Sequence, residues 1–116
     1  MLARVDPTSD APVFAQLASS VRADMASGRL RPGDRLPAAR ELAGALGVNL
    51  HTVLHAYQLL REEGLIDMRR GRGAVVTDAA LPLAELRQEI VELVRRADAR
   101  GVSRDALVSI VRGAPA

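Results

Sequence analysis

The chain has 116 residues, 48% of them hydrophobic and 26% charged, which suits one domain with a core of its own and a short extension. Its net charge of +2 is too small to identify a partner, and the absence of cysteine excludes disulfides and thiolate metal sites. Because no apolar run approaches the roughly 20 residues that span a bilayer and the N-terminus lacks a signal region, we expect a cytoplasmic protein without membrane contact.

A first helix is predicted over residues 12–27, where apolar side chains recur at helical spacing. Gly28 follows at the position where a left-handed residue commonly ends a helix. Residues 29–37 form turn sequence, and Pro37 should hold the preceding Leu36 in an extended conformation.

Two shorter helical segments come next. Residues 38–46 predict a helix that stops at Gly47 and is too short to be stable alone. Asn49 is a good N-cap for a third helix, which should end at Gly64. Two helices joined by a glycine-containing turn are typical of a helix-turn-helix.

A basic hairpin is expected directly after these helices. The β-prone runs LIDM (65–68) and AVVT (74–77) are joined by RRGRG (69–73), and its glycines permit a turn with positive φ. A two-stranded ribbon needs support from neighbouring helices. The predicted fold is therefore mainly α with a small β hairpin: a winged helix-turn-helix domain (1–78) followed by a two-helix tail (79–116).

The tail carries an apolar stripe typical of a short coiled-coil seam, and Ser103 should cap its last helix. The stripe could pack on the chain's own winged domain or against a second copy. We predict a homodimer, because the stripe lies outside an already complete small domain. The candidate dimerisation residues are Leu83, Leu86, Ile90, Leu93, Ala97, Leu107 and Ile110.

The hairpin and the third helix hold the candidate functional residues. In a winged helix-turn-helix the third helix enters the major groove while the hairpin reaches the phosphates or the minor groove. Hydroxyl, imidazole and leucine side chains on that helix can contact base edges, although an ordinary polar face and a solvated arginine turn are the alternative readings. The residues concerned are His51, Thr52, Leu54 and His55 on the helix, and Arg69, Arg70, Gly71, Arg72 and Gly73 on the hairpin.

Motifs for catalysis or metal binding are not evident. The sequence has no nucleophile elbow, no phosphate-binding P-loop and no HExxH. His51 and His55 have the i, i+4 spacing of a chelating pair, but no third ligand is nearby in the sequence. We therefore expect no enzymatic activity, no metal and no cofactor.

The segment from Pro12 to Val76 resembles the winged helix-turn-helix domain of the GntR family of bacterial transcription regulators. The most specific pieces are GRLRPGDRLP (28–37), RELA (40–43), LGVNLHTVLHAY (46–57) and EGLIDMRRGRG (63–73). Together with the short tail they look like the YtrA subfamily, whose members are dimeric repressors, often of ABC-transporter operons and of their own genes. The resemblance implies a DNA contact at Arg40, base reading around Thr52, and a wing tip at Arg72 and Gly73.

The sequence departs from the broad family pattern at three positions. Leu50 and Leu54 stand where many members carry arginines that reach guanine, so His51 or His55 would take over part of that role. Ala38 replaces the usual serine of a capping box, a loss that costs about 1 kcal/mol.

We therefore expect a homodimeric repressor that binds an inverted-repeat operator in double-stranded DNA, with Asn49 helping to orient the third helix. The alternative is a winged-helix adaptor whose hairpin docks on an acidic protein. The tail is too short to enclose a drug-sized pocket of about 300 Å³, so any small-molecule effector would bind at the dimer interface.

Overall fold

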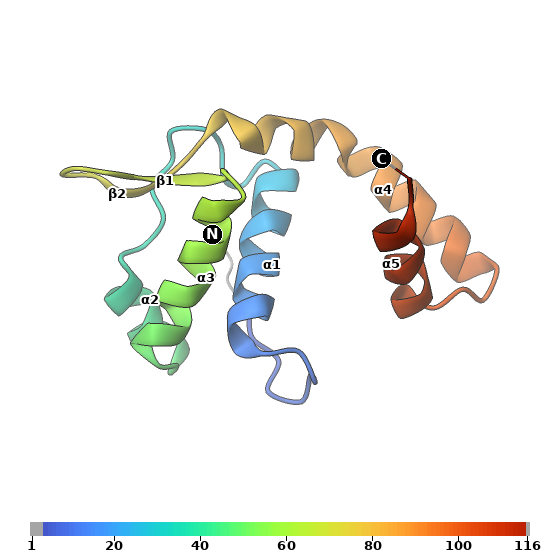
Figure 1. Cartoon of the computed structure of the whole chain (residues 1–116), viewed down its shortest axis with the longest axis horizontal. Coiled ribbons are helices and arrows are strands. Elements are labelled where there is room, and N and C mark those ends of the chain that lie inside the picture. The colour runs from blue at the N-terminus through green and yellow to red at the C-terminus, as the bar shows by residue number, and fades with distance from the viewer. Residues whose placement is uncertain (1–3, 116) are drawn as a thin grey trace. The chain divides into compact units, whose positions relative to one another are not determined.

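The computed structural model describes residues 4–115 and contains two compact units, the first reaching to Glu85 and the second starting at Leu86. The mainly helical fold with one antiparallel hairpin agrees with the prediction (Figure 1). The first unit contains α1 (Val13–Ala26), α2 (Ala39–Leu46), α3 (Leu50–Glu62), β1 (Ile66–Arg69), β2 (Gly73–Val76) and the 3-10 turn η1 (Asp78–Ala80), and α4 (Leu81–Ala99) starts there.

The core of the first unit lies between α1, α2, α3 and the hairpin. Helix α1 runs beside α3, and α2 packs against α3 (Figure 1). Most apolar positions expected to face the core are buried, because the 3.6-residue period places them on one side of each helix, whereas Phe14 and Leu46 are half-buried and pack at its edge. The largest side chains that are completely buried are Leu17, Val21, Met25, Val53, Leu60, Val75 and Val76.

The turn between α2 and α3 forms as the sequence predicts. Gly47 ends α2 in the left-handed conformation, with φ of 67°. Asn49 caps α3, since its side-chain oxygen accepts a 2.8 Å hydrogen bond from the backbone N–H of His51. Ala38 occupies the N-cap position of α2 and provides no side-chain hydrogen bond there, as its replacement of serine implies.

The hairpin is tied to the body of the unit by a segment that was expected to be only a turn. Strands β1 and β2 pair from Ile66–Val76 to Arg69–Gly73, and Arg35 forms an additional antiparallel bridge with Val75. Leu36 donates its backbone N–H to the carbonyl of Ala74 at 2.9 Å. This extra pairing supplies the support that a two-stranded ribbon needs.

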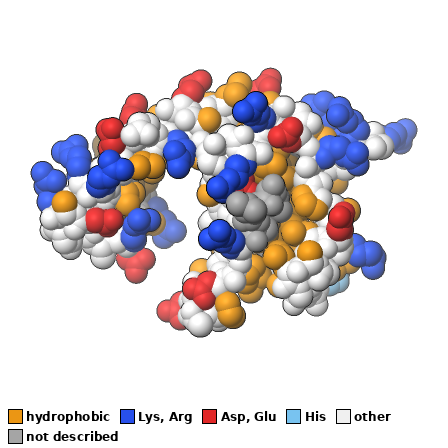
Figure 2. Space-filling view, turned by 180° about the vertical axis from the view of Figure 1, so that it is seen from behind, with side chains coloured by type: hydrophobic (Ala, Val, Ile, Leu, Met, Phe, Trp, Pro, Cys, Tyr) orange, Lys and Arg blue, Asp and Glu red, His pale blue; other side chains and the backbone are white. Residues whose placement is uncertain are grey.

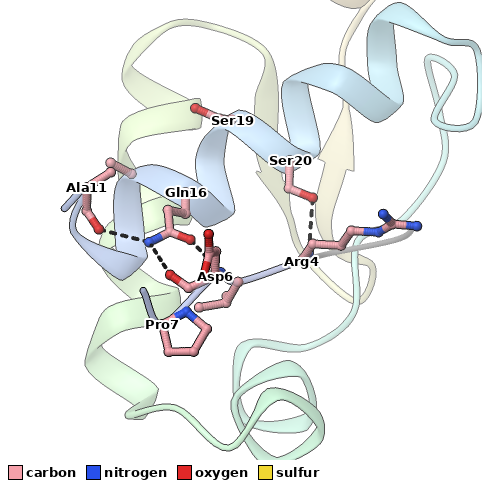
Figure 3. A pocket seen from close by; sticks show the side chains of 9 residues that line it. Arg4, Asp6, Pro7, Ala11, Gln16, Ser19 and Ser20 are labelled. Carbon is pink, nitrogen blue, oxygen red and sulfur yellow. Dashed lines mark hydrogen bonds between the residues drawn. The ribbon is translucent and has the colours of Figure 1, made fainter. Parts of the chain in front are cut away.

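An N-terminal arm lies along α1 and was not predicted. The side chain of Gln16 accepts a 2.7 Å hydrogen bond from the backbone N–H of Asp6 and donates to the carbonyls of Asp6 and Ala11, at 3.1 and 2.8 Å. The backbone N–H of Arg4 donates to Ser20 at 3.2 Å. An open hollow of about 720 Å³ lies between the arm and the helix (Figure 3).

The second unit consists of the remainder of α4 and of α5 (Arg104–Gly113). Gly101 allows the connecting turn with φ of 74°, and the hydroxyl of Ser103 caps α5 by accepting from the backbone N–H of Ala106 at 3.1 Å. Ala97 is the one buried residue of this unit within the described part of the chain. None of the helices within residues 4–115 combines the length and apolarity needed to cross a bilayer.

Candidate nucleic-acid interface

The N-terminal half of α3 presents a mixed polar and apolar surface. His51 is exposed, Thr52 is half-buried, and Leu54 has 45% of its surface exposed to solvent. Leu50 is half-buried because it packs against the hydrophobic core. Asn49 is exposed, and its side-chain oxygen is already engaged as the helix cap. These side chains therefore differ in how much of their surface they offer to a base edge.

His55 has a partner that the sequence did not indicate. Its ring stacks on Phe14 of α1, with ring centroids 3.8 Å apart and planes inclined by 19°. The stack orients the imidazole and ties α3 to α1, as aromatic pairs do. No cluster of three His, Cys, Asp or Glu residues suited to a metal occurs within residues 4–115, and His51 and His55 have no third ligand there.

The hairpin tip is an ordered arginine turn. The backbone N–H of Arg72 donates to the carbonyl of Arg69 at 3.0 Å, and Gly71 and Gly73 have φ of 77° and 72°. Arg69, Arg70 and Arg72 are exposed, and none of them forms an ion pair with a residue in the range 4–115. Figure 2 shows blue arginine side chains gathered around the hairpin. The tip therefore presents uncompensated positive charge.

A further arginine braces that tip. The side chain of Arg35 donates from Nε to the carbonyl oxygen of Arg72 at 2.9 Å. Its backbone is already bridged to Val75, so the contact fixes the turn relative to β2. Arg35 was not among the predicted site residues, because a hydrogen bond between positions 37 residues apart leaves no local signal.

Arg40 lies exposed at the second position of α2. The start of this helix is anchored by Tyr57, whose hydroxyl donates a 2.7 Å hydrogen bond to the carbonyl of Pro37. Burial, with a smaller effect from the negative charge of Glu41, raises the pKa of Tyr57 to about 12. The hydroxyl therefore stays protonated and keeps its role as a donor at neutral pH.

An ion pair fixes the other end of α3. Arg22 of α1 binds the carboxylate of Glu63 through Nε at 2.8 Å and through the terminal nitrogen Nη2 at 2.5 Å. This hydrogen bonding raises the pKa of Arg22, so its charge is secure. Both side chains are more than one third exposed, which limits the contribution of the pair to stability.

The predicted dimerisation residues differ in exposure. Leu83 is half-buried and packs against the core of the first unit. Ala97 is buried, and Leu107 is half-buried. The remaining residues keep large apolar surfaces open to solvent: Leu86, Ile90, Leu93 and Ile110, the last with 64% of its surface exposed.

Comparisons with known proteins agree on one family. A family model described as bacterial regulatory proteins, gntR family, matches residues 14–76. The transcriptional repressor YtrA of Bacillus subtilis (strain 168) is 33% identical over 110 residues, which cover 90% of this chain and 85% of that protein. The structure of YtrA from Sulfolobus acidocaldarius, a GntR-family transcription factor, is 36% identical with a TM-score of 0.63, covering 85% of this chain and 99% of that one.

The DNA-binding domain of AraR, solved in complex with operator ORX1, is 28% identical with a TM-score of 0.56 and covers 64% of this chain and 92% of that one. Three helices followed by a hairpin that packs on them define the winged helix-turn-helix class of DNA-binding regulators. Within that class, this chain belongs to the GntR family of bacterial transcription regulators. The family resemblance is thus confirmed, as is the expectation of a transcription regulator rather than an enzyme.

Proposed function

We propose that this protein is a homodimeric repressor in which residues 1–78 bind an inverted-repeat operator and residues 79–116 hold two copies together. The observation that carries the proposal is the exposed, uncompensated arginine turn in one compact unit with the partly exposed N-terminal half of α3, which would be the recognition helix. The likeness to an AraR domain solved on its operator supports a duplex as the partner. Repression is supported by the likeness to the B. subtilis repressor YtrA.

The arginines and the side chains at the start of α3 would have different roles in DNA binding. Arginines supply affinity for phosphates, which is sensitive to salt and indifferent to sequence, whereas helix residues contact base edges. Arg40, Arg69, Arg70 and Arg72 would bind the backbone, with Gly71 and Gly73 allowing close approach. Sequence discrimination would fall to Asn49, Leu50, His51, Thr52, Leu54 and His55.

Dimerisation is supported by the poor burial within the second unit. A helical pair with one buried residue among those that the structure describes has too little apolar contact to be stable alone, and a second copy would cover its open leucine and isoleucine side chains. A two-fold arrangement would place two recognition helices on the two half-sites of an inverted repeat. The subsidiary proposals are control of an ABC-transporter operon and of the protein's own gene, and a small-molecule effector site at the dimer interface. The protein would act in the cytoplasm.

Titration with operator and random duplexes tests the division of work. Arg70→Ala should weaken binding to every duplex and flatten the log–log salt dependence by about one unit. Thr52→Ala should mainly reduce the ratio of operator to random affinity. Arg112→Ala removes an equal charge from the tail and serves as the matched control, since it should leave both quantities unchanged.

Two outcomes would contradict the proposal. Binding to random DNA without a steep salt dependence would favour the adaptor that docks on an acidic protein. For the dimer, Ile90→Asp should shift the molecular mass measured by light scattering to that of a monomer, whereas Glu89→Gln should not. A wild-type monomer at the concentration that binds operator would refute the proposed assembly.

A further inference from the structure

An apolar groove separates α3 from the hairpin. It has a volume of about 430 Å³ and opens to solvent on the first unit. The start of α2, the middle of α3 and both strands contribute to it. The side chains that give it its apolar character belong to Ala38, Ala39, Leu54, Tyr57, Met68 and Ala74.

Two of these side chains are incompletely packed. Leu54 exposes 45% and Met68 exposes 50% of its surface, although they come from different elements and line the same groove. The only hydroxyl in the groove, that of Tyr57, already donates to Pro37. Leu54 and Met68 therefore offer mainly dispersion contacts, whereas Arg61 and Gln58, whose amide donates to Glu62 at 3.3 Å, form the polar part of the lining.

The charge around the groove indicates what approaches it. Arg61 lines the groove from the α3 side, and the hairpin that forms its other wall ends in Arg69, Arg70 and Arg72. An apolar surface flanked by exposed arginines fits a partner that carries phosphates at its edge and apolar groups inside. Duplex DNA meets that description in the major groove, where the C5-methyl group of thymine projects.

We propose that Leu54 and Met68 form a subsite for a thymine methyl group, so that the protein discriminates by apolar contact at a position where arginine would read guanine. The inference rests on the proposed DNA-binding function. It assigns a role to Met68, which lies on β1 outside the recognition helix. It also predicts at least one required thymine in each operator half-site.

The test begins with selection of bound duplexes from a random-sequence pool by the wild-type protein. Each thymine of the selected site is then replaced by deoxyuridine, which removes the methyl group and leaves the hydrogen-bonding edge intact. At one thymine per half-site we expect affinity to fall about 4-fold, the equivalent of about 0.8 kcal/mol for one buried methyl group. The other thymines should tolerate the replacement.

The protein variants assign the effect to the groove. Leu54→Ala and Met68→Ala should bind the thymine and deoxyuridine sites with nearly equal affinity. Leu81→Ala removes a leucine of similar exposure outside the groove and should keep the 4-fold difference. Circular dichroism checks that each variant is folded. The comparison of thymine and deoxyuridine sites with the wild-type protein does not depend on the variants.

The outcomes distinguish a failure of this inference from a failure of the proposed function. If no sequence is selected and random DNA binds without salt dependence, the proposed function fails. If a site is selected but contains no methyl-sensitive thymine, the inference fails and the function stands. A methyl effect that persists unchanged in both groove variants also overturns the inference.

Discussion

The buried tyrosine of the DNA-binding unit should make the protein lose stability in a narrow alkaline window. Tyr57 is 7% exposed and donates its hydroxyl proton to Pro37. Its pKa is raised to about 12, against about 10 for tyrosine in an unfolded chain. The folded state therefore keeps the proton to a higher pH than the unfolded state does. Stability is complete below about pH 10 and falls as the pH rises toward 12.

The magnitude follows from the difference between the two pKa values. A difference of about two units corresponds to a total loss of about 3 kcal/mol, which is complete only above pH 12, and about half of it has occurred by about pH 11. The composition makes the effect attributable to one group, because the sequence has no lysine and no cysteine and only one tyrosine. Arginine remains charged throughout this range.

The loss in free energy of unfolding is measured by urea unfolding followed by circular dichroism. The measurements use one fixed protein concentration and several pH values from about 8 to 11. Tyr57→Phe is the control. It should be about 1 kcal/mol less stable than the wild type near neutral pH, because the bond to Pro37 is gone, and its stability should stay flat up to about pH 11. Parallel curves for the two proteins, or a native tyrosinate transition near pH 10, would refute the reasoning.

Three further experiments test the local structure of the same unit by urea unfolding. Ala38→Ser should stabilise the protein by about 1 kcal/mol by supplying the missing cap of α2, and a loss of stability would mean that the hydroxyl does not reach the backbone. Gly47→Ala should destabilise by about 1 kcal/mol because of its positive φ, whereas Gly44→Ala within α2 should stabilise by a similar amount; equal effects would contradict the turn. A double-mutant cycle on Arg22 and Glu63 should give a coupling of about 0.5 kcal/mol that shrinks in high salt, and a salt-independent value would argue against an ion pair.

Much of the first unit could be predicted because its signals are local. Gly47 ends a helix and Asn49 starts the next within three positions, and the glycines of the hairpin turn have the positive φ that their sequence suggests. The apolar period alone selected the buried faces of α1 and α3. Features that depend on neighbouring residues in the chain can therefore be predicted from the amino-acid order alone.

The contacts that position the candidate site join distant residues, and no local pattern indicates them. Arg35 meets the hairpin, Tyr57 meets Pro37, and His55 meets Phe14 only because the core brings these segments together. At Leu83 a local pattern is present but does not reveal the packing partner. Its spacing fits the apolar stripe of the tail, although its side chain packs on the core of the first unit. Periodicity identifies an apolar face but not the surface that covers it. The roles assigned to the candidate DNA-binding residues stay predictions.

The arrangement of charge and apolar surface determines how such a regulator would discriminate. Positive charge is concentrated on a turn that Arg35 holds in place, whereas Leu50 and Leu54, which we propose to contact bases, carry no charge. Salt weakens phosphate contacts on every duplex alike, but a methyl group packed against leucine and methionine is almost indifferent to ionic strength. Raising the salt should therefore lower affinity for operator and random DNA together and leave their ratio nearly constant. A recognition helix that used arginine to read guanine would not separate the two effects in this way, because the same side chain would supply both charge and discrimination.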